Sequence, residues 1–246
     1  MENVEFSGYN WYPHEEWGLI HPDKPWNWYS PSCIKVINEK LYLHVKPEPR
    51  IFELPVKGKP EETEKILSPN GIGLVSSKEY FGYGTFEIYA KLPKGKGLWP
   101  AFWLYDHNEW PPEIDIFEGY SGNGGNYKNG IIKRIFYPYN VESCFHSHKN
   151  IGIPNVRPIA YSRKQVRVST YDPFKFNIYT LKWSPLRLVF SVNETITRVI
   201  DDPVIINYLK NRKMRVLINT HIQIGFADKY TQETPFVISH FKYIPL

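Results

Sequence analysis

The chain has 246 residues, a length that suits one domain with its own core, and we expect a single domain over residues 1–246. Its 30 lysines and arginines against 25 acidic residues give a net charge of +5. Because these basic residues are scattered, no nucleic-acid partner is expected. No apolar run approaches about 18 residues, so no membrane-spanning helix is expected. The 18 tyrosines, 14 phenylalanines, 8 tryptophans and 21 prolines favour many short strands over a helical bundle.

Residues 1–31 form an aromatic arm, for which we expect little regular structure and a place around a sheet edge or at the rim of a cleft. Its large aromatic residues are Trp11, Tyr12, Trp17, Trp26, Trp28 and Tyr29. The segment Trp26-Asn27-Trp28 would either supply a stacking platform for sugar rings or anchor a terminal strand, and both interpretations stay open.

The stretch after the arm contains predicted strands and one predicted loop. Residues 34–36 and 40–45 alternate on either side of Asn38-Glu39 and predict a hairpin. Residues 47–70 hold several prolines and a charged run, which favours a solvated loop. Residues 81–93 alternate cleanly and predict a strand, and Lys94–Gly97 predicts the turn that follows it.

Three carboxylates lie within the six residues Glu113–Glu118, separated by isoleucine and phenylalanine. Period-two alternation predicts a strand on which Glu113 and Asp115 share a face. Strict alternation would turn Glu118 away, so we expect a β-bulge around residues 116–117 that returns it to the acidic face. Two carboxyl groups about 5–5.5 Å apart are what a retaining glycosidase needs, and a middle acid can share a proton with the nucleophile. The alternative is an acidic surface strand offset by lysines.

The sequence E-I-D-I-F-E resembles the bulged catalytic motif of glycoside hydrolase family 16, the group of laminarinases, agarases and carrageenases. Residues 97–104 resemble the family's preceding strand. Trp110-Pro111 resembles the W-P that leads into the motif in laminarinases, although the spacer is one proline and lacks the usual glycine. The resemblance implies an all-β jelly-roll sandwich of the concanavalin A type, with two curved antiparallel sheets and an open cleft on the concave face. It also implies that Glu113 is the nucleophile, Asp115 its helper and Glu118 the acid/base.

Downstream of the acids, residues 119–135 and 150–172 favour two basic loops beside the cleft. Between them, residues 143–148 predict a strand on which His146 and His148 share one face. The family places a histidine there facing the sugar, and we favour His146 over His148. Paired histidines also suggest a metal, but no third ligand is evident in the sequence, so no metal site is expected.

The remaining elements alternate strands with one short helix. Residues 176–193 predict a hairpin, Asp201-Asp202-Pro203 predicts the start of a helix that ends near Tyr208, and residues 214–221 and 236–244 predict strands. The resemblance implies that Asn219 faces the cleft and that His221 takes the position of an aromatic residue in the family.

Four aromatic residues complete the predicted substrate site. They are Trp99, Trp103, Trp110 and Tyr83. Trp99 and Trp103 share one side of their strand and would either stack on sugar rings or pack between the sheets, Trp110 is the better stacking candidate, and Tyr83 would lie at the cleft edge. No cofactor is expected. A structural calcium ion is common in the family, without evident ligands here, and Cys33 and Cys144 could pair.

These features predict a retaining, endo-acting glycoside hydrolase of β-1,3-glucan or mixed-linkage β-glucan. The alternatives are a β-galactanase acting on agar-like, sulfated or host glycans, a transglycosylase, and a non-catalytic lectin on the same fold. We expect a monomer outside the cell. Because Met1–Glu5 lacks the features of a signal peptide, export would follow signal removal, another route, or release by lysis or on a phage particle.

Overall fold

The structure is a computed structural model, and it describes residues 3–16, 18–21, 23–119, 140–148 and 160–246. Trp17 and most of the two predicted basic loops, including Lys128, Lys133 and Arg134, lie outside the described residues.

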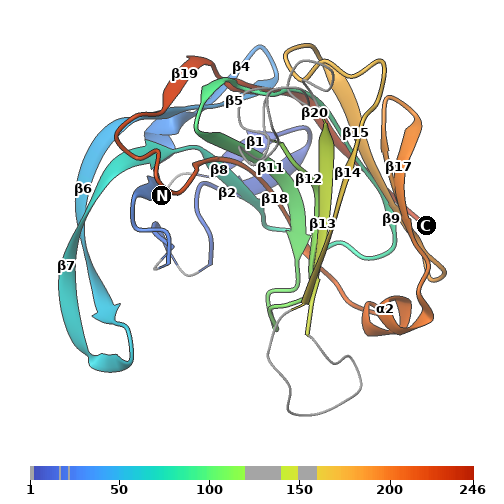
Figure 1. The fold of residues 1–246 in the computed structure, drawn as a ribbon, viewed down its shortest axis with the longest axis horizontal. Helices are drawn as coiled ribbons and strands as arrows, with labels where there is room; N and C mark the ends of the chain where they lie inside the picture. The colour runs from blue at the N-terminus through green and yellow to red at the C-terminus, as the bar shows by residue number, and fades with distance from the viewer. Residues whose placement is uncertain (1–2, 17, 22, 120–139, 149–159) are drawn as a thin grey trace, which may run out of the picture.

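Two large antiparallel sheets make up most of the molecule (Figure 1). The first contains, in spatial order, β1 (Val4–Phe6), β2 (Tyr9–Tyr12), β8 (Leu74–Ser77), β18 (Arg215–Ile222), β11 (Leu98–Tyr105), β12 (Glu113–Glu118), β13 (Val141–Ser147) and β14 (Ala160–Val166). The second contains β17 (Thr195–Ile200), β16 (Leu188–Val192), β15 (Asn177–Trp183), β9 (Gly84–Lys91), β20 (Phe236–Pro245), β5 (Lys40–Leu43) and β4 (Ile34–Ile37).

Smaller elements complete the fold. They are a three-stranded sheet of β3 (Asn27–Tyr29), β7 (Lys59–Ile72) and β6 (Val45–Val56), a two-stranded sheet of β10 (Lys94–Lys96) and β19 (Thr231–Thr234), the short 3-10 helix η1 (Pro31–Cys33) and the helix α2 (Pro203–Tyr208). The β6–β7 hairpin extends away from the sandwich at the left of Figure 1, and β3 runs parallel to β7. This arrangement is the jelly-roll sandwich that the resemblance implied.

The main core lies between the two large sheets, and strand β12 contributes one face to it. Ile114, Ile116 and Phe117 are buried there, and the ring of Phe117 lies 4.3 Å from the ring of Tyr179 in the opposite sheet. Because the apolar side chains of β12 point into this core, its other face is left for the acidic residues.

Most strands predicted by alternation are confirmed, including the hairpins β4–β5 and β15–β16. The helix prediction is also confirmed: Asp202 caps α2 by accepting a hydrogen bond from the Val204 backbone N–H, and a proline occupies the first turn.

Two predictions of irregular structure were wrong. Residues 47–56 and 59–70 lie within the paired strands β6 and β7. Three of the prolines stand on β6, which is an edge strand, and a proline is tolerated there because its missing N–H need not face a neighbouring strand. Residues 160–166 form β14, which pairs with β13 along its whole length. The aromatic arm contains only short strands, and its β1 and β2 extend one end of the first sheet, with β1 at the edge, so its expected place at a sheet edge is confirmed.

No helix in the described part of the chain is long and apolar enough to cross a membrane. Cys33 and Cys144 are both buried and free, so they do not pair with each other.

Candidate active site

A β-bulge in β12 aligns the three acids. Glu113 pairs with Tyr105 on β11 and Asp115 pairs with Trp103, and the register then shifts so that Glu118 lies opposite Ala101. Ile116 is the extra residue, as the alternation pattern predicted. The acids therefore share one face of the first sheet with Ala101, Trp103 and Tyr105.

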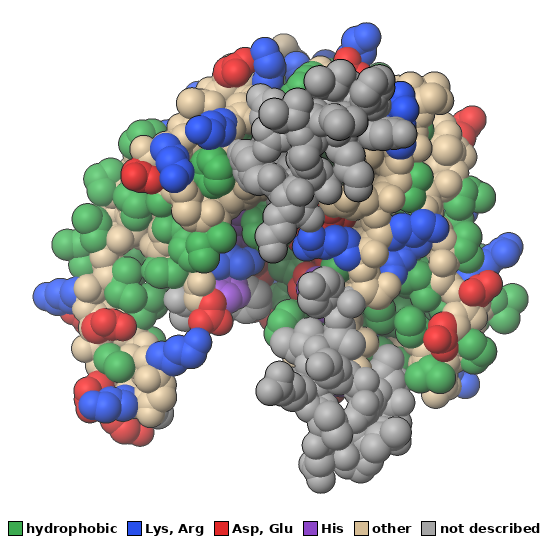
Figure 2. All heavy atoms as spheres, in the orientation of Figure 1, with side chains coloured by type: hydrophobic (Ala, Val, Ile, Leu, Met, Phe, Trp, Pro, Cys, Tyr) green, Lys and Arg blue, Asp and Glu red, His purple; other side chains and the backbone are tan. Residues whose placement is uncertain are grey.

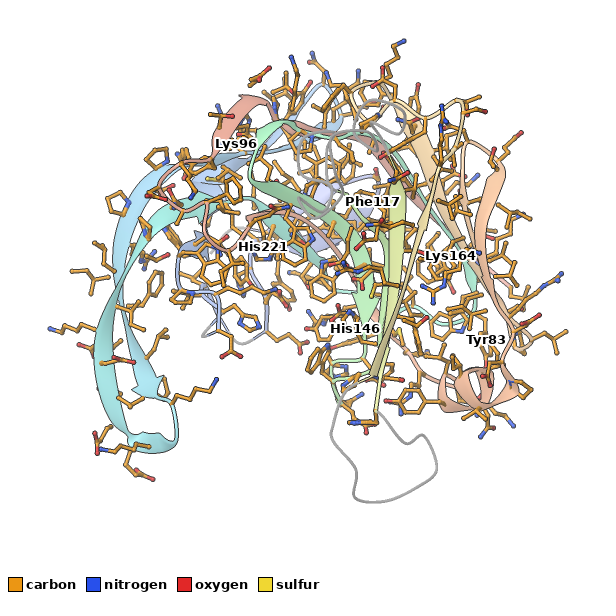
Figure 3. All side chains as sticks on the ribbon, in the orientation of Figure 1. Tyr83, Lys96, Phe117, His146, Lys164 and His221 are labelled. Carbon is orange, nitrogen blue, oxygen red and sulfur yellow. The ribbon has the colours of Figure 1, made fainter. Side chains whose placement is uncertain are left out.

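This acidic face lines a cleft of about 590 Å³. The cleft is formed by Glu15, His21, Asp23, Lys24, Trp99, Ala101, Trp103, Tyr105, Trp110, Glu113, Asp115, Glu118, His146, Asn219 and His221. Figure 2 shows a broad hollow beside the β6–β7 hairpin, and Figure 3 shows His146 and His221 along it. The structure thus gathers all three acids and six of the eight predicted substrate-binding residues in one place.

Two of the acids carry protons more readily than ordinary carboxyl groups. Burial raises the pKa of Glu118 to about 7, and the charges of Glu113 and Glu142 act in the same direction. Burial also raises the pKa of Asp115 well above its usual range, assisted by the charges of Glu113 and Glu118. Glu118 is therefore able to hold a proton near neutral pH, as a general acid must.

Glu113 lies between two nitrogen groups. The indole Nε1 of Trp110 donates a hydrogen bond of 2.7 Å to its Oε2, and Nε2 of His146 lies 3.4 Å from its Oε1. The same His146 nitrogen lies 3.3 Å from Oδ2 of Asp115. Burial by itself would lower the pKa of His146, but its hydrogen bond with Cys144 and the charges of Glu113 and Glu118 raise it overall. These contacts hold both carboxyl oxygens of Glu113 in place.

Three predicted substrate-binding residues form the floor of the cleft. The Nε1 of Trp103 donates a hydrogen bond of 2.6 Å to Oδ1 of Asn219, and the buried Nδ2 of Asn219 has no hydrogen-bond partner among the described residues. Trp99 lies beneath the ammonium group of Lys24, 5.7 Å from its ring centre. The two tryptophans therefore face the cleft rather than the core between the sheets, and Asn219 keeps a donor directed to a polar ligand.

His221 is a buried member of the cleft wall. Burial and the nearby charges of Lys24 and His21 lower its pKa well below the usual value, so it is neutral at physiological pH. Its Nδ1 lies 3.4 Å from Oδ1 of Asn27, and its ring meets Tyr29 edge-on at 5.9 Å. Its ring is thus held by the arm.

Two predicted residues lie outside the cleft. Tyr83 packs its ring against Trp183 and belongs to the edge of the main core, far from His146 in Figure 3. His148 lies beyond the end of β13, where its Nε2 is 3.1 Å from Oε1 of Glu109. Sequence reasoning placed Tyr83 wrongly because a tyrosine beside a core strand serves equally well in packing. For the histidine pair, His146 is the one that faces the acids.

Six cleft residues escaped the sequence analysis: Glu15, His21, Asp23, Lys24, Ala101 and Tyr105. Four of them come from the aromatic arm. The arm is anchored at Ile222: the Nε1 of Trp26 donates to the Ile222 carbonyl oxygen, and the Ile222 backbone N–H donates to Oδ1 of Asn27. The interpretation of Trp26-Asn27-Trp28 as a sugar platform was wrong, because these residues anchor the arm. The irregular arm carries no periodicity that could have marked its four residues. Ala101 and Tyr105 lie two residues before and two residues after Trp103, so strand alternation could have placed both on its face.

Within the described part of the chain, one group of side chains is close enough to hold a metal ion. The ligand atoms of Asp115, Cys144 and His146 all lie within 4.8 Å of one another. A thiolate, an imidazole and a carboxylate suit zinc rather than calcium. This group contains His146 but not His148, and pairing of β12 with β13 brings Asp115 and Cys144 opposite each other. The expectation that no metal is bound stays a prediction.

The model of the family described as glycosyl hydrolases family 16 matches residues 56–223, which include the three acids, Asn219 and His221. The chain belongs to this family. Among curated relatives of this family 16 chain, a keratan-sulfate endo-1,4-beta-galactosidase of Sphingobacterium multivorum is 28% identical over 114 residues, 46% of this chain and 24% of the relative. A beta-1,3-glucan-binding protein of Penaeus monodon is 29% identical over 133 residues, 49% of this chain and 32% of the relative. The chain thus spans less than half the length of these curated relatives.

Solved structures show the same fold. A LamA variant from Zobellia galactanivorans in complex with laminaritriose and laminaritetraose has a TM-score of 0.65 and is 19% identical, covering 92% of this chain and 90% of that one. At this identity the likeness establishes the family 16 fold alone.

Proposed function

We propose that this protein is a retaining, endo-acting glycoside hydrolase of a β-linked polysaccharide. The observation that carries the proposal is the cleft that contains Glu113, Asp115 and Glu118 together, with the pKa of Glu118 raised to about 7. Membership of family 16 supports the same conclusion.

In the first step, the carboxylate of Glu113 attacks the anomeric carbon while the bond to the leaving sugar breaks. Glu118 gives its proton to the departing oxygen, and a glycosyl ester forms on Glu113. Trp110 and His146 orient Glu113 for this attack through their contacts with its two oxygens. The proton held by Asp115 partly offsets the negative charge between the two glutamates.

In the second step, Glu118 removes a proton from water, and the resulting nucleophile attacks the same anomeric carbon. The ester bond breaks and Glu113 returns to a carboxylate. Two inversions at one carbon give net retention. Trp99 and Trp103 offer flat apolar faces for sugar rings, and Asn219 offers an amide donor for a sugar hydroxyl.

We further propose β-1,3-glucan or mixed-linkage β-glucan as the substrate, with the enzyme acting outside the cell as a monomer that needs no cofactor. The W-P before the acids and the fold shared with a LamA structure that binds laminaritriose support the glucan. The similarity to a keratan-sulfate endo-β-galactosidase supports β-galactans as the second candidate class.

A glucan-binding lectin is the alternative from another class, and the similarity to a glucan-binding protein favours it. A lectin would keep the stacking residues but has no need for a glutamate with a pKa near neutrality beside two other acids. This difference favours hydrolysis.

The test is a screen of laminarin, mixed-linkage glucan, agarose, porphyran, carrageenan, keratan sulfate and mucin glycans for both binding and release of reducing ends. We expect release from one class, and we expect Glu113→Ala and Glu118→Ala to abolish release while binding persists. Binding without release by the wild-type protein would identify a lectin, and undiminished release by both variants would overturn the assignment of the acids.

A further inference from the structure

Glu15 is a fourth carboxylate in the cleft. It comes from the aromatic arm rather than from the catalytic strand, and its side chain is only 2% exposed. Neither the motif nor the mechanism above uses it. Such a burial is costly for a carboxyl group unless both of its oxygens find partners.

Only one oxygen of Glu15 has such a partner. The hydroxyl of Tyr29 donates a hydrogen bond of 3.1 Å to Oε1, whereas the buried Oε2 has none among the described residues. A buried polar atom without a partner is destabilising, and such atoms in binding sites are satisfied when the ligand arrives.

Glu15 lies toward the Glu113 end of the acid row. The charge of Glu113 raises the pKa of Glu15, and the charge of Glu15 in turn raises the pKa of Tyr105. Tyr105 is the β11 partner of Glu113. The ionisable groups that shift the pKa of Glu15 come from three parts of the fold. They are Glu16 and Lys24 of the arm, Tyr29 of β3 and Glu113 of β12.

We propose that Glu15 belongs to the substrate site and donates a hydrogen bond from Oε2 to a hydroxyl group of a sugar ring bound beside Glu113. This inference rests on the proposed hydrolase function and adds a polar subsite contributed by the arm. Its ligand is a neutral sugar hydroxyl rather than a cationic or anionic group.

The protonation of Glu15 agrees with a donor role. Burial raises the pKa of Glu15 to about 8, and this outweighs the opposing effects of Tyr29 and Lys24. Below that pH the carboxyl group is neutral: Oε1 accepts from Tyr29, and Oε2 carries the hydrogen that the sugar hydroxyl accepts. Above it, the donor is lost and a second negative charge appears close to Glu113.

This arrangement makes glutamine a close mimic of the protonated side chain. In Glu15→Gln, the amide oxygen accepts from Tyr29 and the amide nitrogen donates in place of Oε2, at every pH. Alanine removes both groups. Glu16→Gln is the matched control, because Glu16 is the adjacent glutamate of the arm but contacts Arg215 at 2.7 Å and does not line the cleft.

The experiment measures kcat/KM from pH 5 to pH 9 on whichever glycan the wild-type enzyme hydrolyses. At pH 6 we expect Glu15→Ala to lose roughly tenfold, the effect of removing one buried hydrogen bond, and Glu15→Gln and Glu16→Gln to stay within about twofold of wild type. The ratio of kcat/KM for Glu15→Gln to that of wild type should rise with pH, with a midpoint near 8. Taking this ratio cancels the shared ionisation of Glu118.

The inference is overturned by a ratio that stays flat with pH together with a Glu15→Ala variant as active as wild type, which would leave Glu15 a structural role only. Should Glu15→Ala fail to fold, the pH dependence of the kcat/KM ratio between Glu15→Gln and wild type still decides whether Glu15 contacts the substrate. A wild-type enzyme without hydrolase activity would instead refute the proposed function on which the inference rests, so the two failures are distinguishable.

Discussion

The stability of this protein should depend on pH through Glu15, and Glu15→Gln should remove that dependence. The pKa of Glu15 is raised from 4.5 to about 8 by burial. Between these two values the folded state keeps a proton that the unfolded chain has released, so the free energy of unfolding falls as the pH rises. The stabilising contribution is complete below about pH 4.5 and is lost as the pH passes 8.

The size of the effect follows from the same two values. Each unit of pKa difference corresponds to about 1.4 kcal/mol, and between pH 5 and pH 9 the shift of Glu15 costs the folded state about 4 kcal/mol. Glutamine cannot ionise, so Glu15→Gln should match the wild type at pH 5 within about 1 kcal/mol and should be more stable by about 4 kcal/mol at pH 9. Asp115 and Glu118 also have raised pKa values, but both residues are present in the wild type and in the variant. Their contributions to the pH dependence of stability therefore cancel in the comparison.

Urea unfolding followed by tryptophan fluorescence at pH 5, 7 and 9 measures this difference. Glu16→Gln is again the control, and the difference between its free energy of unfolding and that of wild type should not grow by about 4 kcal/mol between pH 5 and pH 9. A stability difference between Glu15→Gln and wild type that is the same at pH 5 and pH 9 would refute the burial argument, because an exposed carboxyl group has no such linkage.

Three further predictions concern the acids and the cysteines. Because the pKa of Glu118 is raised to about 7, wild-type kcat/KM should decline above that pH. Glu118→Gln should lower kcat by about 10²–10⁴-fold. With a dinitrophenyl glycoside, whose leaving group needs no proton, this variant should recover most of the rate of the first step. No recovery would show that Glu118 is not the acid. Trp110→Phe removes the donor to Glu113 Oε2 from a ring that is 50% exposed, so kcat/KM should fall about tenfold while the melting temperature stays unchanged; an unaltered kcat/KM would mean that the contact does not orient the nucleophile. Burial raises the pKa of both thiols, that of Cys33 to about 11. An aromatic disulfide reagent should therefore label neither cysteine in the native protein and both cysteines in urea. Rapid labelling of the native protein would contradict their burial.

The catalytic strand was predictable because its pattern is local. Alternation assigns the faces of Glu113 and Asp115, and the misplaced Glu118 requires one extra residue in the strand, which the structure places at Ile116. The same logic found β15 and β16, where each side chain faces either the core or the solvent. Sequence reasoning failed for β6. Prolines are not tolerated in a central strand but are tolerated in an edge strand, and the residues of a strand do not reveal its position within the sheet.

The sequence by itself determined an all-β fold, the row of three acids and most of the cleft floor, because period-two alternation depends only on neighbouring residues. Only the tertiary structure decided which residues from distant segments meet that row. It placed Tyr83 against Trp183 rather than in the cleft. It also brought Glu15 of the arm into the same cleft as Glu113, with the arm anchored by hydrogen bonds between the side chains of Trp26 and Asn27 and the backbone of Ile222, nearly two hundred residues away. Burial there, and not the residue type, turns an ordinary glutamate into a group that keeps its proton at neutral pH.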